Sequence, residues 1–178
     1  MKKYVVYSLL CILFLLVYCG PQYVAPKTPN GDPIVINIKI DPNLVDSLTV
    51  DHQNARKGLA NWMANNLNDK FRKAKYKSQV IPMGQDMPDN GYQISVKFIK
   101  AHFQNKAARF FVGIAAGAAL LEIKYQVSDG KDIIIDEAPP MIDSVKGERE
   151  CAHYFNKKIF QEVHEKMQKK YGVAAIES

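Results

Sequence analysis

The sequence predicts an α+β domain in which two long helices pack on one face of a mainly antiparallel sheet of about four to five strands. Three observations lead to this fold class. Two segments of about 25 residues repeat apolar residues at intervals of three and four, which is the period of an amphipathic helix. Several shorter segments alternate apolar and polar residues, as strands with one buried face do. The Asp129–Gly130 pair between two alternating runs indicates a hairpin turn.

The length and composition fit one ordinary domain with one hydrophobic core. The chain has 178 residues, of which 47% are hydrophobic and 24% are charged, so it is neither a disordered chain nor a collagen-like repeat. The expected organisation is a signal peptide over residues 1–18, a lipidated cysteine with a proline-rich linker over 19–32, a single α+β domain over 33–172 and a tail over 173–178.

The first strand and the first helix follow the linker. Residues 32–41 alternate, with four isoleucines on the face that we expect to be buried and Asn37 among the polar side chains of the other face. Ser47 or Thr49 is expected to cap a helix over residues 50–75. The apolar positions of this helix recur at intervals of three and four and are Ala55, Leu59, Trp62, Met63, Leu67, Phe71 and Ala74.

Four more strands and a closing helix complete the domain. The strands are expected at residues 78–83, 92–103, 119–127 and 133–136. Pro82 places the first of them at an edge of the sheet, and a slip in the alternation near Phe98 indicates a bulge in the second. The helix is expected over 147–171, where apolar residues recur every fourth position at Cys151, Phe155, Ile159, Val163 and Met167.

The N-terminus is interpreted as an export signal. Lys2 and Lys3 precede an uncharged apolar run over residues 4–18, which is short for a membrane-spanning helix. The residues Leu16-Val17-Tyr18-Cys19-Gly20 resemble a bacterial lipobox, although the bulky Tyr18 stands where a small residue is usual. The resemblance implies that Cys19 becomes the lipidated mature N-terminus and that Gly20 favours the outer membrane. A transmembrane anchor that is never cut is the alternative.

Four prolines in the fourteen residues that follow Cys19 indicate a semi-extended spacer. Such a spacer would lift the domain from the bilayer by about 30 Å. Multiple acyl chains on Cys19 would anchor the protein stably, because each buried methylene contributes about 0.8 kcal/mol.

A run rich in glycine and alanine lies before the strand at 119–127. It contains Arg109, Phe110, Phe111, Gly113 and Gly117, and it is too short to span a bilayer. The run is either a connection whose small residues pack under neighbouring elements or an exposed apolar surface that contacts lipid or a partner. In the second case these five residues are the candidate contact site.

A basic patch formed by Lys70, Arg72, Lys73 and Lys75 ends the first predicted helix. Positive charge there complements the helix dipole, and near a membrane it could also contact anionic headgroups. The net charge falls from +6 to +4 when Lys2 and Lys3 leave with the signal peptide, which is too small to indicate nucleic acid as a partner.

The sequence contains no recognisable catalytic, nucleotide-binding or metal-binding motif, so we expect neither an enzyme nor a cofactor or metal site. Cys151 is the one cysteine that remains after Cys11 and Cys19 are assigned, and we expect a buried helix residue there. The four histidines, at positions 52, 102, 153 and 164, are expected at the surface or at helix caps. Four acidic residues are expected on a solvated face: Asp132, Asp136, Glu137 and Asp143.

Four features together resemble an uncharacterised family of exported bacterial domains. They are the strand over 92–99, the run over 109–121, the strand over 122–127 and the Asp129–Gly130 turn. The similarity covers residues 33–171, and it implies a fold and a place in the cell rather than an activity.

We therefore expect a non-enzymatic, lipid-anchored protein of the bacterial cell envelope. It is exported, held to the membrane by its N-terminal lipid, and binds an envelope protein or assists an envelope assembly. A carrier or chaperone for an apolar or lipid ligand is the alternative. The sequence does not determine the oligomeric state.

Overall fold

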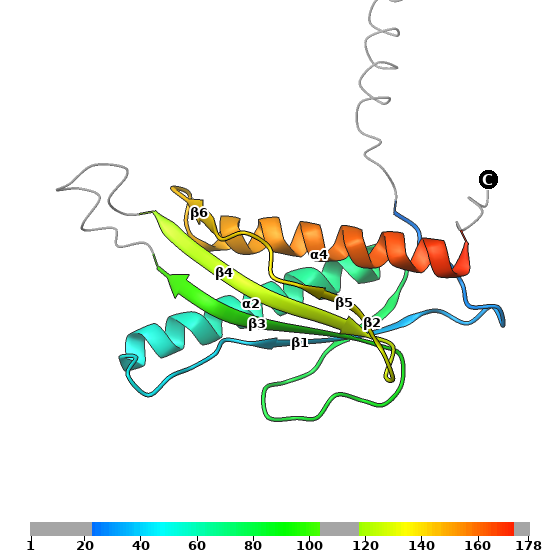
Figure 1. Cartoon of the computed structure of the whole chain (residues 1–178), viewed down its shortest axis with the longest axis horizontal. Coiled ribbons are helices and arrows are strands. Elements are labelled where there is room, and N and C mark those ends of the chain that lie inside the picture. Colours follow the sequence, from blue (N-terminus) through cyan, green and yellow to red (C-terminus); the bar gives the residue numbers. More distant parts are fainter. Residues whose placement is uncertain (1–22, 104–117, 173–178) are drawn as a thin grey trace, which may run out of the picture.

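Two helices cover one face of a six-stranded sheet, which confirms the predicted α+β class (Figure 1). The computed structural model describes residues 23–103 and 118–172. Its elements are β1 (Val35–Asp41), α2 (Val50–Lys73), β2 (Lys77–Val80), β3 (Tyr92–His102), β4 (Ala119–Ser128), β5 (Ile133–Glu137), β6 (Ile142–Ser144) and α4 (Glu148–Tyr171).

The sheet is mixed rather than mainly antiparallel, which corrects one part of the prediction. The strand order is β2-β1-β3-β4-β5, and β6 also pairs with β4. β1 runs parallel to both β2 and β3, whereas all pairs made by β4 are antiparallel. The parallel pair arises because α2 carries the chain back from the end of β1 to the start of β2, as a crossover helix does.

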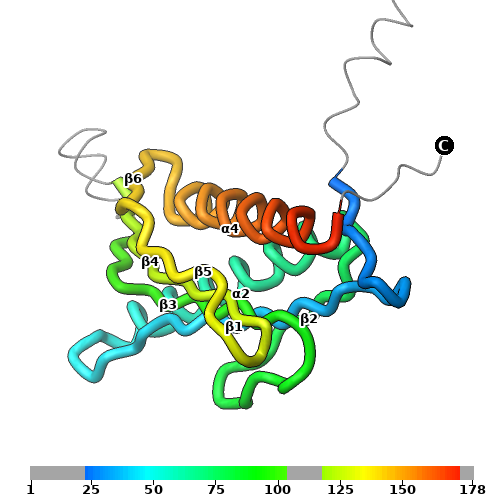
Figure 2. The backbone as a smooth tube through the Cα atoms, turned by 45° about the vertical axis from the view of Figure 1, so that its right-hand side comes forward, coloured from blue at the N-terminus to red at the C-terminus, as the bar shows by residue number. Residues whose placement is uncertain are grey.

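Both helices begin and pack as the sequence predicts. The Thr49 side chain accepts a hydrogen bond from the backbone N–H of His52 at 3.3 Å, so Thr49 caps α2. In α4 the predicted stripe is buried along its whole length, at Cys151, Phe155, Ile159, Val163 and Met167. Figure 2 shows that α2 and α4 lie side by side on the same side of the sheet.

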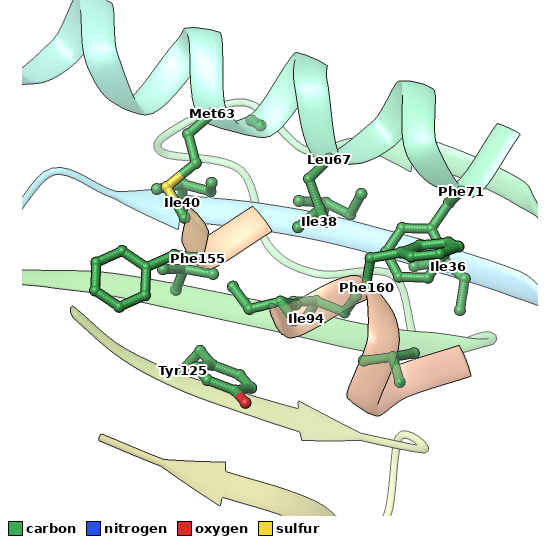
Figure 3. Close-up of a cluster of buried hydrophobic side chains, with 14 of the residues drawn as sticks. Ile36, Ile38, Ile40, Met63, Leu67, Phe71, Ile94, Tyr125, Phe155 and Phe160 are labelled. Carbon is green, nitrogen blue, oxygen red and sulfur yellow. The ribbon is translucent and has the colours of Figure 1, made fainter. Parts of the chain in front are cut away.

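The core lies between the helices and the apolar face of the strands. The four isoleucines at positions 34, 36, 38 and 40 are all buried, as expected from their alternation. Figure 3 shows Met63, Leu67 and Phe71 of α2 pointing toward the isoleucines of β1. Tyr125 of β4 lies in the same layer, and it is 1% exposed.

The strands confirm two details of the prediction, although β2 is shorter than expected and β6 is an additional strand. β2 ends at Val80, two residues before Pro82, and within the described residues it pairs only with β1, so its edge position is confirmed. The register of β3 shifts between Phe98 and Lys100, which confirms the bulge. β6 was not predicted, because three residues are too few for an alternation to be visible.

Asn37 is fully buried, although its face of β1 was expected to be exposed. The loop that precedes β3 covers this side chain. Its amide donates to the carbonyl of Asn90 at 2.7 Å, and its oxygen accepts from Gln79 Nε2 at 2.7 Å. Period-two alternation reports the face of a strand, but not whether a loop folds over that face.

The first four described residues, Tyr23–Pro26, pack on the domain and are called the N-terminal strap here. The N–H of Ala25 donates to the carbonyl of Ala74 at 2.6 Å, and Ala25 and Pro26 are buried. Figures 1 and 2 show the strap beside the second half of α4. Part of the segment expected to be an extended spacer is thus attached to the domain.

Candidate functional site

A basic groove lies where the N-terminal strap crosses between the end of α2 and the middle of α4. Its volume is about 630 Å³. Three segments that are far apart in the sequence line it, and their residues are Tyr23, Val24, Lys70, Lys73, Ala74, Lys75, Lys157, Phe160 and Gln161. The groove therefore forms only when the strap and the two helices are folded together.

Four lysines form the rim of the groove. Lys70 and Lys73 belong to the last turn of α2, Lys75 follows that helix, and Lys157 comes from α4. No carboxylate lines the groove, and within the described part of the chain none of these lysines forms a salt bridge. Burial, followed by the positive charges of Lys73 and Lys157, lowers the pKa of Lys70. The rim thus carries uncompensated positive charge.

Two aromatic side chains, Tyr23 and Phe160, line the groove and are called its aromatic floor here. The ring of Tyr23 meets the ring of Phe160 edge to face, with centroids 5.2 Å apart. His164 stacks on Phe160 at an interplanar angle of 10°. An apolar floor under a cationic rim suits a ligand that has both an anionic and an apolar part.

His164 corrects the expectation that all four histidines lie at the surface or at caps. It is 2% exposed, and its Nδ1 atom forms a 2.7 Å hydrogen bond with the hydroxyl of Tyr76. Burial lowers the pKa of His164 and raises that of Tyr76, so both groups are held in their neutral forms. The other three histidines are exposed, as predicted.

The groove is lined by few kinds of polar group. Its lining contains lysine ammonium groups, aromatic rings, one amide and the Tyr23 phenol, without a carboxylate, thiol or imidazole. Cys151 is fully buried and burial raises its pKa to about 11, which confirms the expected buried helix residue and makes a thiolate unfavourable. Across residues 23–103 and 118–172, no group of three metal-ligating side chains is close enough to hold an ion.

The structure brings together part of the predicted basic patch. Lys70, Lys73 and Lys75 line the groove, whereas Arg72 is exposed and does not. The other predicted contact and lipidation residues lie outside the described residues: Cys19, Arg109, Phe110, Phe111, Gly113 and Gly117. The predicted acidic group lies on an exposed surface, in agreement with the expectation.

Sequence reasoning missed the groove residues that come from the strap and from α4. Lys157 was one of several polar residues of the closing helix, and nothing in its spacing distinguished it. Tyr23 was assigned to a spacer. The signal that could have indicated packing is the apolar triplet Tyr23-Val24-Ala25, because exposed linkers are usually polar.

Another pocket, of about 310 Å³, lies between β5 and α4. β5 begins with three consecutive isoleucines, and Ile133 is 60% exposed. Among the described strands, β5 pairs only with β4, so its other edge is open. Charged side chains of both signs from α4 line the pocket: Glu162, Glu165, Lys166 and Lys169.

None of the described helices is both long enough and apolar enough to cross a membrane. The buried faces of α2 and α4 are instead used within the domain, against the sheet and against each other.

The family described as "Domain of unknown function (DUF4410)" matches residues 30–175. No curated protein matches the chain. Among solved structures, the chain is similar to a hypothetical protein from Chlamydia trachomatis, with 6% identity over 76% of this chain and 98% of that chain and a TM-score of 0.42. It is also similar to a putative neuraminyllactose-binding hemagglutinin homolog from Helicobacter pylori, with 12% identity, coverages of 84% and 94%, and a TM-score of 0.41.

Proposed function

The chain belongs to the DUF4410 family, a family of unknown function, and from its own residues we propose that it is a non-enzymatic, lipid-anchored protein of the bacterial cell envelope that binds a protein partner. The expected export signal and the lipobox-like sequence at Cys19 support a position at a membrane, and Gly20 favours the outer membrane. The domain then acts as a binding module held at the membrane surface.

The docked N-terminal strap is the observation that carries this proposal. Only residues 20–22 separate Cys19 from Tyr23, which already packs on Phe160 and His164. A fully extended chain spans at most about 14 Å over four residues. A lipid on Cys19 would therefore hold the domain, with its basic groove, close to the bilayer rather than about 30 Å above it.

The open edge of β5 is the surface that best suits a protein partner. An unpaired strand edge with exposed apolar side chains readily accepts an extended segment of another chain. The pocket beside it adds charged groups from α4 that a bound segment can contact. We propose that an extended segment of an envelope protein pairs with β5, while the basic groove faces the membrane.

Crosslinking in native membranes tests the partner. The full-length lipidated protein is treated with a mild crosslinker, purified and analysed by mass spectrometry. We expect a stoichiometric envelope protein that is lost in an Ile133→Lys variant, because an apolar strand at this edge would have to desolvate the added ammonium group. The matched control is Ile99→Lys on β3, where an exposed isoleucine is replaced away from the β5 edge.

Retention of the same partner by Ile133→Lys, or its loss in Ile99→Lys as well, would contradict the role of β5. The anchor is tested separately with Cys19→Ala, which should leave an uncut and unlipidated precursor. A processed, membrane-anchored form of that variant would rule out lipidation at Cys19.

A carrier or chaperone for an apolar or lipid ligand is the second candidate. The volume of the basic groove, about 630 Å³, is within the range of small-molecule sites, and its floor is aromatic. Lipid that copurifies in the absence of any crosslinked protein would favour this function over partner binding.

A further inference from the structure

We propose that the basic groove binds the phosphate headgroup of an anionic phospholipid in the bilayer to which the protein is anchored. The location of the ligand rests on the proposed lipid anchor, whereas its chemistry follows from the groove alone.

The positive charge of the groove favours an anionic ligand. Lys70, Lys73, Lys75 and Lys157 converge on one opening, and no carboxylate among the lining residues neutralises them. Burial and the neighbouring ammonium groups lower the pKa of Lys70, so the free groove has unfavourable like-charge repulsion. A bound phosphate would relieve this repulsion.

The dipole of α2 does not explain the cluster. Positive side chains at a helix C-terminus are commonly stabilised by the dipole, which accounts for Lys70 and Lys73. Lys157, however, lies near the middle of α4, where the helix dipole does not stabilise a positive charge. Its position opposite the end of α2 brings a second element into the same cationic site.

The aromatic floor indicates an amphiphile rather than a free ion. Tyr23 and Phe160 line the same groove as the lysines, and inorganic phosphate would leave their apolar surface unused. A phospholipid places glycerol and the first methylenes of its acyl chains beside the phosphate. In such a molecule the phosphate can contact the lysines while the apolar part contacts the aromatic rings.

Under the proposed lipid anchor, the strap would hold the groove close to the phospholipids of the bilayer. Tyr23 and Val24 line the groove, and Cys19 precedes Tyr23 by four residues. With an acyl-modified Cys19 in the bilayer, the groove opens within about 14 Å of the lipid surface. Lysines near an anionic surface each strengthen binding about fivefold, so the four act together.

Native mass spectrometry of the full-length lipidated protein in a nonionic detergent tests this inference. Phosphatidylglycerol or phosphatidylcholine is added in the same detergent, and the number and strength of bound lipids are measured. We expect one phosphatidylglycerol to bind at least tenfold more tightly than phosphatidylcholine. A third titration uses inorganic phosphate, which we expect not to displace the lipid.

A charge-matched pair of triple variants assigns the binding to the groove. Lys70→Gln/Lys73→Gln/Lys157→Gln should weaken phosphatidylglycerol binding at least tenfold, because the charged hydrogen-bond donors to the phosphate are removed. The control Lys97→Gln/Lys100→Gln/Lys131→Gln removes the same charge from exposed lysines outside the groove and should bind as the unmodified protein does. A thermal melt of each variant establishes that it is folded.

Three results would overturn the inference. They are undiminished lipid binding by the folded groove variant, equal losses in both triple variants, and displacement of the lipid by inorganic phosphate. Binding of an acidic peptide in preference to phosphatidylglycerol would likewise replace the lipid with a protein ligand.

The same samples separate this inference from the proposed anchor. The mass of the N-terminal peptide reports whether Cys19 carries acyl chains. Headgroup binding without acylation would refute the anchor and keep the groove assignment. Acylation without headgroup binding would do the reverse.

Discussion

Gly91 joins the loop after β2 to β1 through a close backbone contact. Its φ of +79° is unfavourable for residues with a Cβ, and an added Cβ would lie 2.7 Å from the Cβ of Val35. We therefore expect Gly91→Ala to lower the free energy of unfolding by about 2 kcal/mol or more, since backbone strain and steric overlap add. Denaturant-induced unfolding measures this change.

Gly58→Ala serves as the control because the same substitution should have the opposite sign there. Gly58 lies inside α2, with nothing within 4 Å of an added Cβ. Replacing a helical glycine by alanine typically stabilises by about 0.5–1 kcal/mol. A loss of stability at Gly58, or no loss at Gly91, would contradict these local descriptions.

His164 makes stability depend on pH. Its pKa is lowered from the ordinary value near 6.5, mainly by burial, so the unfolded chain binds a proton more readily than the folded one. The contribution of this group is constant above about pH 6.5 and is progressively lost as the pH falls below that value. We expect a lower free energy of unfolding at about pH 5.5 than at about pH 7.5.

The histidine variants identify the group responsible. His164→Gln should reduce the difference between the two pH values, whereas His153→Gln, at an exposed position of α4, should retain it. Equal pH dependence in both variants would show that His164 is not the source.

At the scale of elements, the loop before β3 is held to the sheet by a buried amide. Asn37 bonds to Asn90 in the loop and to Gln79 in β2, and it is 0% exposed. Asn37→Ala should cost about 1–3 kcal/mol, because the partners lose their bonds in a partly buried place. Ser95→Ala on an exposed position of β3 is the control, expected to change stability by less than about 0.5 kcal/mol. An Asn37→Ala variant as stable as the control would contradict this role.

The sequence predicts elements well wherever side-chain periodicity is strong. The stripe of α4 and the isoleucines of β1 are buried as expected, because a period identifies a face. The partners and directions of the strands could not be predicted in the same way. Nothing in the alternation of β1 says that it runs parallel to β2 and β3, since pairing depends on where the crossover helix returns the chain.

At the scale of the whole molecule, the basic groove combines three distant segments. The charge run at the end of α2 was visible as a local pattern, so Lys70, Lys73 and Lys75 could be predicted. Lys157 and Tyr23 could not, because their place in the groove depends on how α4 packs beside α2 and on the docking of the strap. Burial of His164 beneath this site has the same origin.

With the proposed lipid on Cys19, the N-terminal strap would limit how far the domain can lie from the membrane. As an extended spacer, the segment would allow about 30 Å of separation, and the groove would have no defined relation to the lipid surface. The strap instead contacts Ala74 and Phe160, so that Tyr23, four residues after Cys19, already lies in the groove. Under the proposed lipid anchor, the N-terminal lipid and the groove would therefore lie on the same side of the domain.

The distance of the groove from the bilayer tests this account most directly. Spin labels are placed at Gln161→Cys in the groove and at Ser95→Cys on the sheet face away from the helices, in the full-length lipidated protein in vesicles. Cys151 is buried and does not compete for the label. Lipids with a nickel-chelating headgroup should relax the label at position 161 strongly and the label at position 95 weakly. Equal relaxation, or stronger relaxation at position 95, would contradict a domain that rests on the membrane through its basic groove.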